Sequence, residues 1–182
     1  KKMKPRLSIG VCVLISLALV IFGLLFGTAK GYEDDRAQAV VLLEGENGLL
    51  DALSYRAADG LNLCVVAKRH MAGDADVAAL ETVAKRLQDG RGLLAQKKQA
   101  DGELKAAMEA VVTKLQANQS FQNSERDQKY VNMLSTDFGN LSKSMPAEAY
   151  NAEAMNFNAQ LQTPLIGDFA KLLGVKPCEL YE

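Results

Sequence analysis

The sequence predicts an all-α protein in which an N-terminal single transmembrane helix runs into a long antiparallel three- or four-helix bundle. Three observations support this prediction. Ala, Leu, Gln, Lys and Glu, which favour helix, dominate long stretches of the chain. The β-branched and aromatic residues typical of strands are sparse after the first thirty positions. Between the apolar N-terminal segment and Pro146 there is no proline, so nothing in that stretch forbids long helices.

The first element is an apolar segment near the N-terminus, LSIGVCVLISLALVIFGLLF, which contains no charged residue over residues 7–26. Twenty helical residues rise about 30 Å, the thickness of the hydrocarbon core of a bilayer. The apolar region of a signal peptide is shorter, at about 7–15 residues. The small residues Gly27-Thr28-Ala29 would also suit a cleavage site, but the length favours an uncleaved anchor over residues 7–29.

Basic residues flank this segment unevenly. Four of them precede it without any acidic residue: Lys1, Lys2, Lys4 and Arg6. After it, Lys30 and Arg36 are mixed with acidic residues. The positive-inside rule therefore predicts a cytoplasmic N-terminus at residues 1–6 and an extracytoplasmic domain at residues 30–182.

Three glycines follow one another at intervals of four residues: Gly23, Gly27 and Gly31. This spacing places them on one face of a helix, where the backbones of two helices can approach closely. The glycines are therefore candidates for helix–helix association. The alternative is that glycine is simply frequent in transmembrane helices.

The next helix carries a stripe of mostly small apolar residues at spacings of three and four. The stripe consists of Leu50, Leu53, Ala57, Gly60, Cys64, Ala67 and Met71. Such a stripe faces a neighbouring helix, and its small side chains predict a close approach. Outside the membrane, the stripe is also expected to aid assembly with other copies of the chain. Gly73 is expected to end this helix, and Asp74 or Asp76 to cap the next one.

The remaining elements are delimited by glycine, proline and polar clusters. A second helix is expected from Ala75, weakened at residues 89–92 and again at residues 100–102, with a turn at residues 116–125. A third helix would bury one arc of side chains: Tyr130, Leu134, Phe138, Leu141 and Met145. Pro146 then kinks that helix or begins a new one. Pro164 and Gly174 punctuate a short last element and a tail.

Little in the chain indicates chemistry. The cysteines Cys12, Cys64 and Cys178 form no CxxC motif, although a bridge between Cys64 and Cys178 stays open outside the cytoplasm. The only histidine, His70, falls at an expected helix end, where a helix-terminal or surface role is more common than catalysis. No nucleophile elbow or phosphate-binding loop is present. We therefore expect no catalytic residue, metal or cofactor, and no enzyme.

The charge pattern also argues against nucleic acid as a partner. Setting aside the four N-terminal cations leaves 17 of the 21 basic residues against 22 acidic ones, a net charge of about −5. No stripe of Lys and Arg with interleaved aromatic residues occurs, so the electrostatic footprint of a nucleic-acid-binding protein is missing.

Several short motifs resemble the LemA family in their order along the chain. They are an Arg followed by Asn-Leu (Arg56, Asn62, Leu63), LQANQSF at residues 115–121, YN at 150–151, FN at 157–158 and GVKPCELYE at 174–182. The chain departs from the family pattern at Leu61, where Pro is common, and at Ala147, where Arg is common. The resemblance covers most of residues 32–182. It implies a bacterial, membrane-anchored helical bundle. The family has no agreed biochemical activity, so the resemblance implies none for this chain.

Two asparagines, Asn151 and Asn158, lie seven residues apart in a segment that is otherwise helix-favouring. On a helical wheel they fall between two apolar groups, one of which contains Tyr150 and Phe157. They are therefore expected to point into the bundle or into a protein interface, with Arg56 as a neighbour. Each would bond a facing helix and fix its register, or else line a polar ligand groove.

Together these features predict a non-enzymatic, membrane-anchored scaffold or interaction protein of the bacterial inner membrane. Its expected partners are the lipid bilayer and either identical copies in a homo-oligomer or another envelope protein. The alternative is an extracytoplasmic binding module for a small or lipidic ligand in an inter-helix groove. The packing and interface candidates are Gly23, Gly27, Gly31, Arg56, Asn62, Tyr150, Asn151, Phe157 and Asn158.

Overall fold

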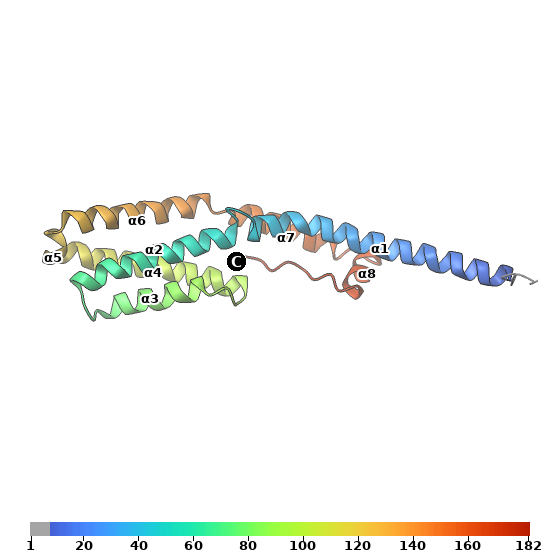
Figure 1. The fold of residues 1–182 in the computed structure, drawn as a ribbon, viewed down its shortest axis with the longest axis horizontal. Coiled ribbons are helices and arrows are strands. Elements are labelled where there is room, and N and C mark those ends of the chain that lie inside the picture. The colour runs from blue at the N-terminus through green and yellow to red at the C-terminus, as the bar shows by residue number, and fades with distance from the viewer. Residues whose placement is uncertain (1–7) are drawn as a thin grey trace, which may run out of the picture. The chain divides into compact units, whose positions relative to one another are not determined.

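The computed structural model describes residues 8–182, and within that range the chain is helical and contains no strand (Figure 1). The all-α prediction is confirmed. Six helices have fourteen residues or more: α1 (Ile9–Glu44), α2 (Leu49–His70), α3 (Ala75–Gln88), α4 (Leu94–Ala117), α6 (Glu125–Ser144) and α7 (Ala147–Gln160). Two are short: α5 (Gln119–Gln122) and α8 (Ile166–Leu172). The expected basic N-terminus at residues 1–6 and the first residue of the expected span lie outside the described residues.

Helix α1 is long and apolar enough to cross a membrane. Its 36 residues include an apolar window of which no part is buried inside the protein. The exposed large apolar side chains of this window are Ile9, Val11, Val13, Leu14, Ile15, Leu17, Leu19, Val20, Ile21, Phe22, Leu24 and Phe26. The helix continues without a break past residue 29, the expected end of the span, to Glu44.

The described chain divides into two compact units. The first contains the chain up to Ala39 together with Ala154–Cys178, and the second contains Val40–Glu153 together with Glu179–Glu182. The first unit has a small core made of Tyr32, Phe157, Leu161 and Ala170, with Val175 and Cys178 packed against it. The ring of Tyr32 meets that of Phe157 edge-on, with 6.2 Å between centroids. The Tyr32 hydroxyl donates a hydrogen bond to the carbonyl of Gln160 at 3.0 Å.

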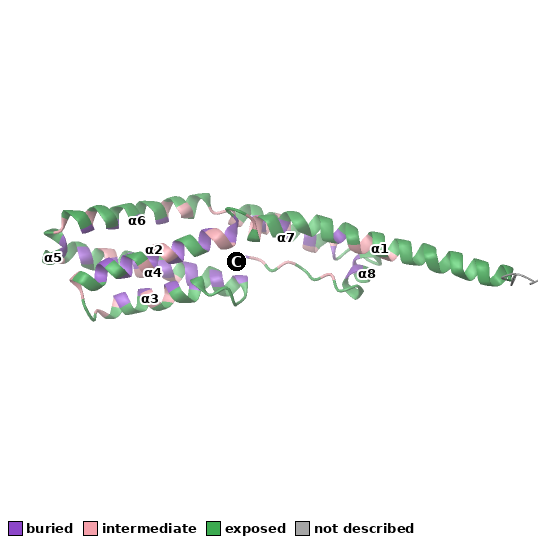
Figure 2. Cartoon of the chain, in the orientation of Figure 1, coloured by how far each residue is buried: buried purple, intermediate pink, exposed green. Residues whose placement is uncertain are grey.

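In the second unit, α2 packs against α3, α4 and α6, and α3 packs against α4 (Figure 1). The apolar stripe of α2 lies in this core, where Ala57, Cys64 and Ala67 are buried (Figure 2). Gly60 permits the closest approach, because a Cβ atom there would lie 2.8 Å from Cδ1 of Leu104. The stripe therefore meets helices of the same chain and is not an open surface for another copy.

Two helix boundaries lie where glycine and proline predict them. The predicted weakening of a helix at residues 100–102 is wrong. Residues 89–93 separate α3 from α4, and α7 begins directly after Pro146. Residues 100–102, in contrast, lie inside α4. One internal glycine costs a helix only about 1 kcal/mol. Burial of the neighbouring Ala100 and Leu104 offsets that cost.

Helix α6 buries a face that differs slightly from the expected arc. Leu134 and Phe138 are buried as expected, but Tyr130 is exposed. Val131 and Asp127 complete the buried face instead. The buried face therefore differs from the expected arc at its N-terminal end, where Val131 is buried in place of Tyr130 and the Tyr130 ring lies at the surface.

Candidate functional site

Arg56 lies in a buried ionic network in the second unit. Its Nε donates to Oδ1 of Asp101 on α4 at 2.6 Å, and the Arg56 side chain is only 3% exposed. One terminal nitrogen donates to the carbonyl of Phe138 at 3.1 Å and also to the hydroxyl of Ser142. The guanidinium stacks on the Phe138 ring, 3.8 Å from its centroid. Arg56 therefore connects α2 to α4 and α6. A buried cation needs such hydrogen-bond and ion-pair partners because it has lost its hydration.

The same network fastens the C-terminal residues. Tyr181 is buried, and its hydroxyl donates to Oδ2 of Asp101 at 3.3 Å. Burial, followed by the negative charge of Asp101, raises the pKa of Tyr181 well above its usual range. Glu179 is bonded twice: its carbonyl accepts from the Tyr150 hydroxyl at 2.5 Å, and its carboxylate accepts from the backbone N–H of Leu94 at 3.0 Å. That carboxylate caps the N-terminus of α4, where the helix dipole favours a negative charge.

The two asparagines of α7 bond the tail in the same way. In the second unit, the Asn151 amide donates to the carbonyl of Tyr181 at 2.9 Å and accepts from its N–H at 2.8 Å. In the first unit, Asn158 makes the same pair of bonds to Cys178, at 2.9 and 2.8 Å. A side-chain amide carries one donor and one acceptor at the spacing of a peptide group, so each asparagine replaces a missing backbone partner.

The seven-residue spacing of the asparagines suits this task. Seven residues of α-helix rise about 10.5 Å, and three residues of extended chain span about 10 Å. Amides seven apart on a helix can thus bond tail residues three apart. Arg56, the expected neighbour of Asn151, instead bonds Asp101, Phe138 and Ser142.

The other interface candidates differ in exposure. Gly23, Gly27 and Gly31 lie on the open surface of α1, with no atom within 4 Å of a Cβ built at any of them. Phe157, in contrast, belongs to the core of the first unit, and Tyr150 is buried. Only the glycines and Asn62 therefore present an exposed surface.

His70, at the end of α2, is the centre of a second polar cluster. Its Nε2 lies 2.8 Å from Oδ2 of Asp127, and its Nδ1 lies 3.0 Å from the Ser120 hydroxyl. Arg69 donates to the other oxygen of Asp127 at 3.0 Å. These contacts hold the pKa of Asp127 below its usual value, with the hydrogen bond to His70 as the largest cause. His70 is the last residue of α2, so the expected helix-terminal position is confirmed, whereas its side chain is buried and does not lie at the surface.

The order Ser, His, Asp also occurs in hydrolases, but here it joins helix ends. The backbone N–H groups of Ser120 and Phe121 both donate to Oδ1 of Asn118, so neither is available to an oxyanion. The Asn118 amide also donates to the carbonyl of His70 at 3.1 Å. The cluster thus connects the end of α2 to α5 and α6.

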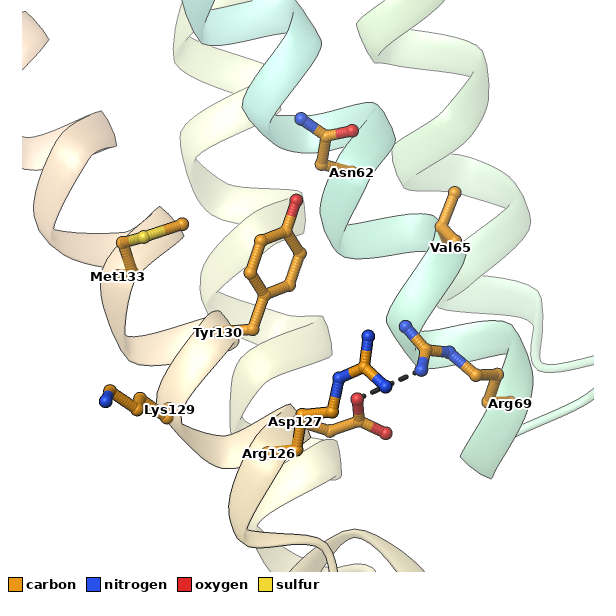
Figure 3. A pocket seen from close by; sticks show the side chains of 8 residues that line it. All are labelled: Asn62, Val65, Arg69, Arg126, Asp127, Lys129, Tyr130 and Met133. Carbon is orange, nitrogen blue, oxygen red and sulfur yellow. Dashed lines mark hydrogen bonds and ion pairs between the residues drawn. The ribbon is translucent and has the colours of Figure 1, made fainter.

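An open groove of about 640 Å³ lies beside this cluster, between α2 and α6 (Figure 3). Its lining residues are Asn62, Val65 and Arg69 from α2, and Arg126, Asp127, Lys129, Tyr130 and Met133 from α6. Val65 and Met133 are apolar yet 61% and 49% exposed. Figure 3 shows the Tyr130 hydroxyl directed along the groove towards Asn62, and the guanidinium of Arg126 beside that of Arg69.

The groove carries unneutralised positive charge at one end. Arg69 is paired with Asp127, but within the described residues Arg126 and Lys129 form no ion pair. Sequence reasoning found Asn62 but missed the rest of the groove. The signal was present in α6, where Arg126, Tyr130 and Met133 recur at helical spacing on one face.

The described residues contain no group of three or more His, Cys, Asp or Glu side chains placed to hold a metal ion. Cys12, Cys64 and Cys178 are all free thiols, and no disulfide joins Cys64 to Cys178. Burial is the main cause that raises the pKa of the Cys64 thiol, to about 11, so this side chain packs as an apolar group. The chain matches no family model, no curated protein and no solved structure.

Proposed function

We propose that this protein is a non-enzymatic, membrane-anchored helical interaction protein. In this proposal α1 crosses the bacterial inner membrane with its N-terminus in the cytoplasm. The later helices form a LemA-like antiparallel bundle outside the cytoplasm. The observation that carries the proposal is the apolar window of α1, none of which is buried inside the protein. Apolar surface exposed to water is unfavourable by about 25 cal/mol per Å², whereas lipid would cover it.

An interaction role suits the use of the polar residues better than catalysis does. The buried charges of Arg56 and Asp101 hold helices and tail together, and the His70 cluster joins helix ends. The amides of Asn151 and Asn158 are bonded to the tail backbone. These groups stabilise a rigid surface and leave no nucleophile and base poised at an open site.

We further propose that the partner includes a second copy of the chain, associated through the glycine face of α1. Gly23, Gly27 and Gly31 are exposed and unobstructed, so another helix could approach their backbone closely. The stripe at residues 50–71 cannot serve this purpose, because α3 and α4 cover it. Self-association would therefore depend mainly on the anchor.

The test is the mass of the full-length protein in mild detergent, beside a version lacking residues 1–30. We expect a defined oligomer that dissociates on truncation and is weakened by Gly27→Leu. Gly10→Leu is the matched control. A Cβ atom at Gly10 would also have no atom within 4 Å, but Gly10 does not belong to the three glycines that are spaced four residues apart. An unchanged mass for Gly27→Leu would exclude the glycine face, and monomers throughout would exclude self-assembly.

A second candidate function is binding of a small or lipidic ligand. The open groove between α2 and α6 favours it, since its volume suits a drug-sized molecule. Its test is thermal stabilisation of the protein by members of a ligand library. Stabilisation that disappears in Tyr130→Ala, but not in Tyr55→Ala on the exposed surface of α2, would support this candidate.

A further inference from the structure

We propose that the groove between α2 and α6 receives an amphipathic helix of a partner protein, with acidic side chains against Arg126 and Lys129 (Figure 3). This inference deepens the proposed function and rests on it. It assigns a location and a chemical class to one of the interactions.

The walls of the groove suit a helix. α2 and α6 pack side by side, and the valley between two packed helices accepts the side-chain ridge of a third. Val65 and Met133 stand on opposite walls with much of their surface exposed. An apolar face with residues at i, i+3, i+4 and i+7 would cover both.

The charges of the groove indicate that one end of the partner helix carries acidic side chains. Arg126 and Lys129 are unpaired among the described residues, and the carboxylate of Asp127 is shared between Arg69 and His70. This local excess of cations stands out because the chain after the N-terminal cations is acidic. Carboxylates on the partner would supply the missing negative charge, and such complementarity sets orientation and association rate.

The opposite end of the same surface is acidic. Asp59 lies one helical turn before Asn62 on α2, and Asp137 lies one turn after Met133 on α6. Oδ2 of Asp59 is itself buried, without a hydrogen-bond partner among the described residues, but the side chain of Asp137 is exposed. A Lys or Arg on the partner helix can therefore pair with the carboxylate of Asp137.

This two-ended pattern favours a peptide over a lipid. An anionic headgroup would satisfy Arg126 and Lys129 but would place nothing cationic near Asp137. About two to three helical turns separate Lys129 and Arg126 from Asp137 on α6, a distance that a short amphipathic helix covers with apolar side chains between its charges. The groove therefore has a polarity that an amphipathic helix can match along its length.

The experiment uses the full-length chain in mild detergent and a fluorescent sixteen-residue helical peptide. The peptide carries Leu along one face, Glu at one end and Lys at the other, and its binding is followed by fluorescence anisotropy against empty micelles. We expect Arg126→Glu to weaken binding about tenfold. The matched control Arg36→Glu changes an exposed arginine of α1 and should leave binding unchanged.

Charge exchange supplies the decisive comparison. A peptide with Gln in place of Glu should bind more weakly to the unaltered protein and be insensitive to Arg126→Glu. A peptide with Lys in place of Glu should bind the Arg126→Glu protein better than the unaltered one. Equal binding of the Glu and Gln peptides would overturn the inference. So would displacement of the peptide by short-chain phosphatidylglycerol whose own binding depends on Arg126, because the occupant would then be a lipid.

Failure of this inference and failure of the proposed function give different results. If the peptides do not bind but the protein still forms a defined assembly in detergent, only the groove assignment is wrong. If the protein also stays monomeric, the interaction role itself loses its support.

Discussion

The second unit of the chain places its apolar side chains against its own helices, whereas the first unit leaves most of its apolar surface uncovered. In the second unit, small residues such as Gly60 let α2 lie against α3 and α4, and a buried network around Arg56 satisfies the polar groups. In the first unit the core has four buried residues, and no residue of the apolar window of α1 is buried. The second unit therefore covers most of its own apolar side chains, while the first unit has a small core and leaves the apolar window of α1 uncovered.

The largest expected effect is in the buried network of the second unit. Arg56→Ala would leave the carboxylate of Asp101 buried without its cation, which should lower the free energy of unfolding by about 3–5 kcal/mol. Urea unfolding of the full-length protein in detergent measures this loss. The control is Arg86→Ala, which removes an ion pair to Glu103 whose two side chains are 52% and 39% exposed, and should change stability little. Equal losses from the two variants would show that the Arg56 network contributes no more than a surface pair.

The asparagines allow the same kind of bond to be tested in both units. Asn158→Ala removes the partner of Cys178 in the first unit, and Asn151→Ala removes that of Tyr181 in the second. Each change should cost about 1–3 kcal/mol, because a peptide group loses both hydrogen bonds. Hydrogen exchange should accelerate at the amide of Cys178 in one variant and of Tyr181 in the other.

The control for both changes is Asn156→Ala, since Asn156 is exposed on the same helix. If either asparagine variant accelerated exchange at both amides equally, the tail would open as one segment. The contrast between the units would then not extend to their tail contacts.

The sequence predicted what periodicity and composition encode. The helices and the buried stripe of α2 follow from residue spacing, and the break after Gln88 follows from the glycines at positions 90 and 92. Periodicity shows which face of a helix is buried but not which molecule covers it. The stripe was therefore assigned to an interface with other copies, although helices of the same chain bury it.

The polar contacts were harder to predict because they join distant parts of the chain. The bond between Asp101 and Tyr181 spans 80 positions, and the sequence around Asp101 resembles a helix breaker. The Asn151 and Asn158 amides bond a tail with no regular secondary structure, which leaves no periodic signal. Only the spacing of the asparagines suggested that they have a common role.

Asp59 offers a test through pH in the second unit. Burial, and then the negative charge of Asp137, raise its pKa from 3.8 to about 6, while Arg56 acts in the opposite direction. The folded protein therefore binds more protons than the unfolded chain between about pH 4 and 6, and this carboxyl group destabilises the fold as pH rises through that window. Asp59→Asn should raise stability at pH 7 and leave it nearly unchanged at pH 4.

Thermal unfolding of the two proteins between pH 4 and 8 measures that difference, and the comparison cancels the other titrating groups. A constant difference between Asp59→Asn and the unaltered protein across the range would mean that folding leaves the pKa of Asp59 at its ordinary value.

The smallest expected effects come from replacing two helical glycines of the second unit by alanine. The two variants distinguish the contribution of close packing from that of helix propensity. Gly102 lies inside α4 with no atom within 4 Å of a Cβ built there, so Gly102→Ala should stabilise the protein by about 0.5–1 kcal/mol. Gly60→Ala gains the same propensity but brings its Cβ to 2.8 Å from Leu104, so it should show no gain or a loss. Urea unfolding of the two variants measures the contrast. Equal stabilisation would mean that the Leu104 side chain moves aside freely, and that α2 does not need its small residues to approach α4.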